Sequence, residues 1–226
     1  MANLAQMRML EVLDGILLVD KPAGIAFPTV VKTVKRKFGL VKVGHGGSLD
    51  AMASGLLVLL LNDANKFVDR VMGADRAYTG TMKFGETTDT GDRCGRPVPR
   101  PERVMTPAEA RGDIFQTEPR FCAVRREGSA EYEVVDTGDH GQFLAHIYRF
   151  EVGEDLGGKG AEFSLLASKG VIVRALAQDL GATLTSLRRT AVGRFSVADA
   201  VPFDRLLETE TKDFASCVMP LSKALL

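Results

Sequence analysis

The chain has 226 residues, 45% of them apolar and 26% charged, and its 29 basic residues balance 29 acidic ones. These proportions are typical of a soluble globular protein that buries a sizeable core. They exclude a transmembrane helix, because no apolar run approaches the roughly 20 residues that span a bilayer, and the amino-terminal residues lack the pattern of a secretory signal.

The first part of the chain predicts a strand, a basic helix and a glycine-rich loop. An apolar run over Ile16–Val19, closed by a Pro/Gly turn, predicts a strand. Apolar residues then recur at helical spacing over 29–38, with Thr29 as the expected N-cap and Gly39 as the stop. After the loop "VGHGGSLD" the pattern predicts a buried strand over 56–61, a helix over 64–72 and a strand over 77–85.

The second part predicts mostly strands. Turn residues dominate the loop over 87–102. The remaining expected elements are a short helix from Thr106 followed by a mixed strand, strands over 131–135, 143–152 and 162–168, and a helix over 171–184. We see no repeat, low-complexity segment or linker, so the expected class is α+β with mixed strands.

Basic residues concentrate in two segments although the net charge is zero. Residues 21–49 hold six Lys or Arg and no acid, and residues 168–198 hold five against Asp179 alone. Residues 199–213 are acidic. If the two basic segments fold side by side they form a positive face, which favours a nucleic-acid partner, but two solvated surfaces explain the same composition.

The cysteines and histidines give no metal pattern. The three cysteines are odd in number and far apart, without a CxxC pair, so we expect reduced thiols in a cytoplasmic protein. The three histidines lack the spacing of a metal site. We therefore expect no metal site. The residues concerned are Cys94, Cys122, Cys217, His45, His140 and His146.

Asp50 is the candidate for chemistry among the residues themselves. It stands alone between the glycine-rich loop and an apolar stretch, and neither a P-loop nor a G-x-S-x-G motif accompanies it. A lone carboxylate serves as a nucleophile or base when a cation keeps it charged, and Arg174 in "GVIVRALA" is a candidate partner. A solvated loop acid and a surface-reaching helix arginine are the open alternatives. "TDTGDRCG", over 88–95, is by itself a polar turn, because it lacks the last glutamate of a calcium loop.

Several motifs together resemble those of the TruB-type pseudouridine synthases. In chain order they are "GILLVDKPAG", "VGHGGSLDAMASGLL", "DRAYTGTMKFGETTDTGDRCG", "GDIFQTEPRFCAVRREG", "SKGVIVRALAQDLG" and "LRRTAVGRF", with a weaker likeness in "MPLSKALL". The resemblance implies a pseudouridine synthase fold, with a mixed, largely antiparallel central sheet flanked by helices. It also implies isomerisation of uridine 55 in the T-loop of transfer RNA.

The resemblance assigns roles to individual residues. Asp50 corresponds to the family's nucleophile, Tyr78 to the tyrosine that packs against the target base, and Arg174 to the ion-pair partner of Asp50. The stretch 88–92 falls on the family's loop near the active site, which replaces the polar-turn interpretation. The residues expected to contact RNA are His45, Lys21, Lys32, Lys35, Arg36, Lys42, Thr88, Asp89, Lys169, Arg188 and Arg189.

The implied reaction needs one charged aspartate and no cofactor. It breaks the C1′–N1 bond, turns the base and rejoins it through C5. Attack on C1′, attack on C6 and removal of the C2′ proton are three open routes for the carboxylate. The target base has to leave the stack, at a cost of a few kcal/mol, and basic residues hold the phosphates.

The chain also departs from the family pattern, at Gly47, Ala51, Glu118, Cys122 and Ile172. It ends where relatives usually continue into a PUA domain, so we expect residues 1–226 to be a single catalytic domain without one. We further expect a cytoplasmic monomer that binds the T-arm of tRNA without a guide RNA or a membrane. The alternatives are a synthase acting on another RNA, and a non-catalytic RNA-binding or RNA-folding protein.

Overall fold

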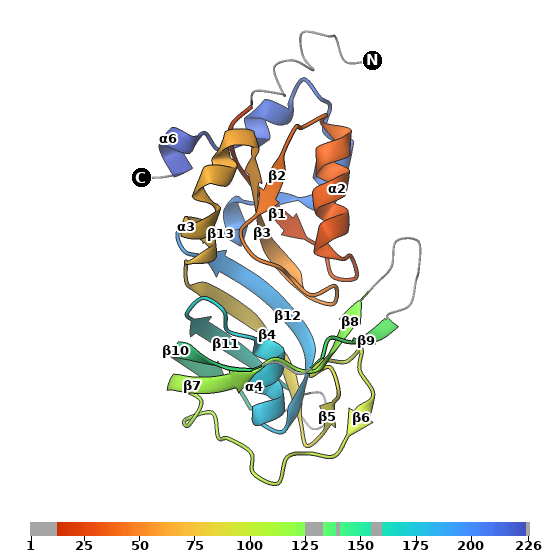
Figure 1. Cartoon of the computed structure of the whole chain (residues 1–226), viewed down its shortest axis with the longest axis vertical. Helices are drawn as coiled ribbons and strands as arrows, with labels where there is room; N and C mark the ends of the chain where they lie inside the picture. The colour runs from red at the N-terminus through yellow and green to blue at the C-terminus, as the bar shows by residue number, and fades with distance from the viewer. Residues whose placement is uncertain (1–12, 125–132, 139–140, 155–159, 225–226) are drawn as a thin grey trace.

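A ten-stranded mixed sheet forms the centre of the molecule (Figure 1). The computed structural model describes residues 13–124, 133–138, 141–154 and 160–224. The strand order is β14-β1-β3-β12-β4-β11-β10-β7, with β2 paired to β3 and β13 paired to β12. These strands are β1 (Gly15–Lys21), β2 (Val43–His45), β3 (Ser54–Leu61), β4 (Arg76–Phe84), β7 (Gly112–Thr117), β10 (Gln142–Val152), β11 (Ala161–Ala167), β12 (Ala182–Val192), β13 (Phe195–Ser196) and β14 (Val201–Pro202).

Two short hairpins and several short helices complete the fold. The hairpins pair β5 (Thr87–Thr88) with β6 (Pro97–Val98), and β8 (Phe121–Val124) with β9 (Glu133–Asp136). The α-helices are α2 (Phe27–Lys37), α3 (Val68–Met72), α4 (Val173–Asp179), α5 (Phe203–Glu208) and α6 (Leu221–Ala224), and the 3-10 helices are η1 (Asn62–Phe67), η2 (Val197–Asp199) and η3 (Phe214–Cys217). Among the described helices, none has the length and apolar composition needed to cross a membrane.

A short parallel contact between β3 and β12 joins two halves of the sheet. Arg188 lies opposite Ser54 and Arg189 opposite Gly55, and the other pairings of the central path are antiparallel except β1 with β14. Gly55 has a φ of +103°, and a Cβ there would clash with the Arg189 backbone. The glycine therefore permits the close approach at the junction, and Figure 1 shows one half above it and one half below.

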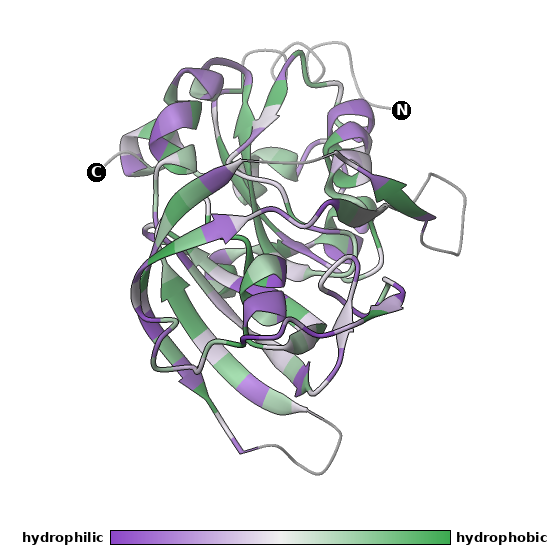
Figure 2. Ribbon diagram, turned by 60° about the horizontal axis from the view of Figure 1, so that its bottom comes forward, coloured by the Kyte–Doolittle hydropathy of each residue, from purple (hydrophilic) through white to green (hydrophobic). Residues whose placement is uncertain are grey.

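The core lies on both faces of β3. Leu57, Leu59 and Leu61 belong to the larger apolar cluster, which includes α2 residues such as Val34. Leu56, Val58 and Leu60 face the other way, into a smaller cluster with Val71 of α3. Burial on both faces explains why this strand is a continuous apolar run rather than an alternating one. Figure 2 shows hydrophobic ribbon on strands in the interior of the molecule.

The structure confirms the α+β class and the mixed, mostly antiparallel sheet flanked by helices. The basic helix starts at Phe27 rather than after Thr29, because Pro28 occupies the first turn, where its missing N–H costs nothing. The helix expected over 64–72 is a 3-10 turn followed by α3. Asn62 has a φ of 48°, and the Asn65 side chain bonds the carbonyl oxygens of Leu60 and Asn62.

Two further expected helices are corrected. The helix expected over 171–184 ends at Asp179, because Gly181 adopts a φ of +62° and residues 182–184 already belong to β12. Turns replace the short helix from Thr106. The strand expected over 131–135 is described as β9 from Glu133 on, and residues 131–132 lie outside the described residues.

Candidate active site

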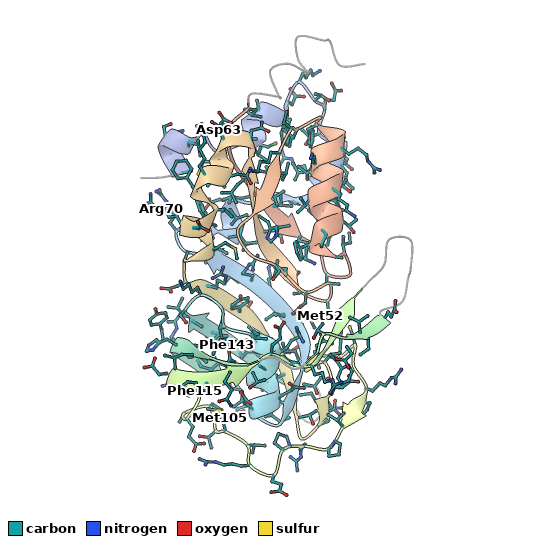
Figure 3. The ribbon with its side chains drawn as sticks, in the orientation of Figure 1. Met52, Asp63, Arg70, Met105, Phe115 and Phe143 are labelled. Carbon is teal, nitrogen blue, oxygen red and sulfur yellow. The ribbon has the colours of Figure 1, made fainter. Side chains whose placement is uncertain are left out.

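The glycine-rich segment forms the connection between β2 and β3, two antiparallel strands. The Gly46 N–H donates to Val58, and a Cβ at Gly46 would clash with Val71. Gly47 has a φ of +128°, which favours glycine. Met52, labelled in Figure 3, marks the end of this connection nearest the lower half of the molecule. The loop thereby presents Asp50 toward α4.

Asp50 and Arg174 form an ion pair between the two halves. Arg174 donates from Nε to Asp50 Oδ2 over 3.0 Å, and the Arg174 side chain is 5% exposed while that of Asp50 is 37% exposed. Arg174 also donates from Nη1 to the carbonyl oxygens of Thr90, at 2.8 Å, and Phe121, at 3.4 Å. Several hydrogen bonds thus fix the guanidinium, while the carboxylate keeps a face open to solvent.

The loop after β5 also supports Arg174. Gly91, at a φ of +75°, lies so close to α4 that a Cβ there would be 2.6 Å from the Arg174 carbonyl oxygen. Thr88 accepts a hydrogen bond from the Gln178 side chain through its carbonyl oxygen. This stretch is therefore part of the support of the site, as the family resemblance implied, and more than a polar turn.

Asp92 shapes the same loop from inside. Its carboxylate is buried and accepts hydrogen bonds from the Thr90 hydroxyl and the Cys94 N–H, each at 2.9 Å. Burial raises the pKa of Asp92, and the hydrogen bonds and the charge of Arg174 oppose that rise. Sequence reasoning placed Asp92 near the site without giving it a role.

Two buried cations anchor the Asp50 loop. The Lys21 ammonium donates to the carbonyl oxygens of Pro22, Ile25 and Ala53. Burial lowers the pKa of Lys21 to about 8, against the attraction of Asp50. Arg189, 1% exposed, donates to the carbonyl oxygens of Gly47, Ser48 and Leu56 at 2.8–3.1 Å.

Sequence reasoning missed Arg76, which completes this support. Its guanidinium donates to the carbonyl oxygens of Met72, Ala74 and Gly46 at 2.7–3.5 Å. Burial lowers the pKa of Arg189; the Tyr78 hydroxyl opposes that shift, whereas the charge of Arg76 adds to it. The strand period was an available indication, because Arg76 and Tyr78 stand two residues apart and so share one face of β4.

Tyr78 lines a small cavity with Asp50 and Arg174. The cavity measures about 130 Å³ and is also lined by apolar side chains that include Ile172 and Leu187. This is below the roughly 300–1,000 Å³ of typical ligand pockets, so it accommodates a single ring rather than a nucleotide.

A larger cleft of about 650 Å³ adjoins the cavity and shares Tyr78 and Ile172 with it. Arg76, Lys169 and Arg189 line this cleft. Asp69 and Glu118 line it as well, so charged side chains of both signs stand directly beside the cavity that holds the carboxylate.

The residues expected to contact RNA fall into different environments. Lys32, Lys35 and Arg36 are exposed on α2, and Lys42 is exposed shortly after it. Lys169 is exposed at the rim of the larger cleft. For these residues RNA binding stays a prediction, and the structure leaves their charges accessible.

His45, Thr88 and Asp89 have bonds within the protein. His45 packs edge-on against Phe27 at 4.8 Å and accepts a hydrogen bond at Nδ1 from Gly47, and burial lowers its pKa. The Thr88 hydroxyl donates to the Asp92 carbonyl oxygen, and Asp89 accepts from the Arg96 N–H. Contact with RNA stays untested for all three.

Lys21, Arg188 and Arg189 are not presented to the cleft as free cations. Lys21 and Arg189 are buried and bond carbonyl oxygens. Arg188 points to the opposite face of β12, where it forms two hydrogen bonds to Asp20 at 2.7 and 2.9 Å. It lines a separate hollow of about 790 Å³ with Thr79 and others. This geometry disfavours the expected RNA contacts of these three residues.

Within the residues that the structure describes, no three His, Cys, Asp or Glu side chains gather closely enough to hold a metal ion. The functional groups that the described residues supply at the site are the ion pair, the tyrosine, the apolar walls and the cations around them. Such a site supports nucleophilic or base chemistry by one carboxylate on a ring bound against Tyr78.

Comparisons with known proteins agree with this chemistry. Residues 35–173 match the family model of the TruB family pseudouridylate synthase, N-terminal domain. The chain is 38% identical to tRNA pseudouridine synthase B of Bordetella avium (strain 197N) over 213 residues, covering 86% of this chain and 87% of the relative. It is 37% identical to tRNA pseudouridine synthase B of Azoarcus sp. (strain BH72), covering 87% and 70%.

The fold agrees as well. A chain in the crystal structure of the archaeal box H/ACA sRNP Nop10-Cbf5 complex superposes with a TM-score of 0.66 at 24% identity. The match covers 96% of this chain and 63% of that one, so this chain spans about two thirds of its length. The molecule is thus an RNA-modifying isomerase of the pseudouridine synthase class. The chain belongs to the TruB family of pseudouridylate synthases.

Proposed function

We propose that this enzyme converts uridine 55 in the T-loop of tRNA to pseudouridine, with Asp50 as the reacting carboxylate. The observation that carries the proposal is the Asp50–Arg174 ion pair at a cavity lined by Tyr78. The names of the relatives, tRNA pseudouridine synthase B, support tRNA as the substrate.

The cavity and the cleft suit different parts of an extruded nucleotide. The uracil ring enters the cavity of about 130 Å³ and lies against Tyr78, while Ile172 and Leu187 give it apolar walls. The ribose and its phosphates occupy the adjoining cleft, where Lys169 supplies an accessible charge. Taking the base out of the stack costs a few kcal/mol, which these contacts offset.

The reaction then exchanges two bonds to C1′. The C1′–N1 bond breaks and its electron pair stays on the uracil. The ring turns, a bond forms between C5 and C1′, C5 loses its proton and N1 gains one, so atoms and charge balance. Asp50 bonds to C1′ as the C1′–N1 bond breaks and is displaced when C5 bonds to C1′, or it adds to C6 and is eliminated after the C5–C1′ bond has formed, or it takes the C2′ proton and returns it. Arg174 holds the carboxylate in position through the 3.0 Å hydrogen bond.

In this proposal the described residues form one catalytic domain. The enzyme acts as a monomer without a guide RNA, in the cytoplasm where tRNA is found. The exposed basic residues of α2 support binding of the T-arm, because they are close in sequence to the Asp50 loop and their charges are accessible.

The test is incubation of the enzyme with an unmodified tRNA transcript followed by pseudouridine mapping. We expect a single modified position, uridine 55, and none in a transcript carrying cytidine there. Modification elsewhere in the first transcript would point to another RNA site, and no modification would contradict the proposal.

A further inference from the structure

Residues 93–103, "RCGRPVPRPER", form an exposed segment that we call the arginine loop. Four arginines and one glutamate stand within these eleven positions. Arg93, Arg96, Arg100 and Arg103 are all exposed. In a chain whose net charge is zero, this is a local excess of positive charge that the catalytic site does not use.

The arginine loop is held in place rather than loosely attached. Its central part is β6, which pairs with β5, and the Thr87 hydroxyl donates to the Val98 carbonyl oxygen at 3.1 Å. Three prolines restrict its backbone. Directly after it, the Met105 N–H donates to the Asp179 carbonyl oxygen at the end of α4. Met105 is labelled below α4 in Figure 3.

In the part of the chain that the structure describes, three of its cations lack an ion-pair partner. Among the described residues, Arg93, Arg96 and Arg100 form no ion pair with an acidic side chain, whereas Arg103 lies 3.7 Å from Glu109. An isolated exposed arginine is usually only solvated. Three such charges on a braced backbone form an electrostatic footprint for an anionic partner.

The arginine loop is tied directly to the support of Arg174. The Arg96 N–H donates to Asp89 Oδ1 at 2.9 Å, and Gly95 packs so tightly on Thr90 that a Cβ would clash there. The carbonyl oxygen of Thr90 in turn accepts from Arg174. Arg93, the first of the three arginines, therefore directly follows the stretch 88–92 that supports Arg174.

The placement adds a second basic surface beside the site. Figure 1 shows β5 and β6 on the same side of the molecule as α2, with the β8–β9 hairpin between them. The exposed Lys32, Lys35 and Arg36 belong to α2. The arginine loop and the basic face of α2 thus lie on the same side of the molecule, one in each half.

We infer that the arginine loop binds the phosphate backbone of the substrate RNA beyond the target nucleotide. The inference rests on the proposed function, because it takes the RNA to be bound at the Asp50 cleft. Guanidinium groups suit this partner, since their planar donors match two phosphate oxygens at once. The loop then extends the surface that holds the RNA and contributes affinity without reading bases.

The test compares two triple variants of the same charge. The first is Arg93→Gln, Arg96→Gln, Arg100→Gln. The control is Lys66→Gln, Lys212→Gln, Lys223→Gln. It removes one exposed charge from η1, one from the segment that follows α5 and one from α6. The dissociation constant for the tRNA transcript is measured from 50 to 200 mM KCl, and thermal unfolding of both variants is recorded to confirm that they fold.

We expect the arginine variant to bind at least tenfold more weakly at 100 mM KCl. The plot of the logarithm of the dissociation constant against log[salt] should become less steep. Its slope should decrease by about two to three, close to one for each phosphate that the variant no longer neutralises. The control should bind within twofold of the wild type with an unchanged slope. An arginine variant that matches the wild type in affinity and slope overturns the inference, and that result is also expected if the loop serves an acidic protein instead. Wild-type pseudouridine formation is measured on the same preparation, so a failure of the proposed function is seen separately.

Discussion

Arg174 donates a hydrogen bond of 3.0 Å to Asp50 across 124 positions of sequence. The bond joins a loop of the upper half of the molecule to a helix of the lower half, and Arg174 is fixed further by Thr90 and Phe121. The position of the Asp50 carboxylate therefore depends on the docking of both halves. Changes to the partners of this ion pair should affect the reaction rate before they affect RNA binding.

Arg174→Ala should lower kcat at least a hundredfold, because Asp50 loses the group that aims it. Arg174→Lys should also lose most of the rate, since one ammonium cannot replace the guanidinium bonds to Asp50, Thr90 and Phe121. Steady-state kinetics on the tRNA transcript check both variants. Arg149→Ala, on an exposed part of β10, is the control. A normal kcat with a raised KM would show that Arg174 only binds RNA.

Tyr78→Phe should distinguish the contribution of the aromatic ring from that of the hydroxyl. The phenyl ring still lines the cavity, so RNA affinity should stay within twofold, while kcat falls at least tenfold if the hydroxyl takes part in proton transfer. Tyr78→Ala should weaken both, because the surface for the base is lost. Single-turnover rates with enzyme in excess distinguish these effects. An unchanged rate for Tyr78→Phe would leave the tyrosine as a stacking surface alone.

Arg188→Gln should leave RNA affinity within twofold of the wild type, although its sequence neighbourhood is basic. Arg188 pairs with Asp20 on the face of the sheet opposite Tyr78. Lys169→Gln, at the rim of the cleft, should weaken binding several-fold. Fluorescence titration with labelled tRNA measures both. Equal losses for the two variants would mean that RNA reaches the far face.

Asp179→Asn should stabilise the protein at neutral pH. Burial raises the pKa of Asp179 to about 6 from an ordinary value of 3.8. Between these values the folded state binds more protons than the unfolded state, so the contribution of Asp179 to stability falls as pH rises. The variant should therefore match the wild type near pH 3.5 and exceed it by about 1 kcal/mol at pH 7, after allowance for partial exposure.

Urea unfolding at pH 3.5, 5, 6 and 7 checks this dependence. Asp213→Asn is a suitable control, because Asp213 is exposed and its side chain makes no capping hydrogen bond. A constant difference between Asp179→Asn and the wild type at every pH would contradict the assignment of the pH dependence to this carboxyl.

The sequence predicted the elements with clear periodicity better than their ends. The apolar run of β3 and the basic helix α2 were both expected, because burial on two faces and a 3.6-residue spacing leave strong patterns. The end of α4 was not, since the turn at Gly181 passes straight into β12 within an apolar pattern that fits a longer helix.

For the site, residue patterns alone left Asp50 and Arg174 with two interpretations each, and the family resemblance was needed to pair them. The buried cations could not be found by counting charges, because Lys21, Arg76 and Arg189 look like surface residues in composition. Arg188 and Arg189 show why a count of charges does not identify buried cations. They are neighbours in a strand, so their side chains point to opposite faces, and only assignment of that strand separates their roles.

The carboxylate of Asp50 is, in the proposed function, the group that performs the chemistry. The most direct measurement is single-turnover pseudouridine formation on the tRNA transcript by Asp50→Asn, with RNA affinity measured in parallel. The amide has nearly the same shape but lacks the charge, so we predict less than about one percent of the wild-type rate and binding within a few-fold. A rate above that level, with reversion to aspartate by deamidation excluded by mass spectrometry, would contradict this role of Asp50.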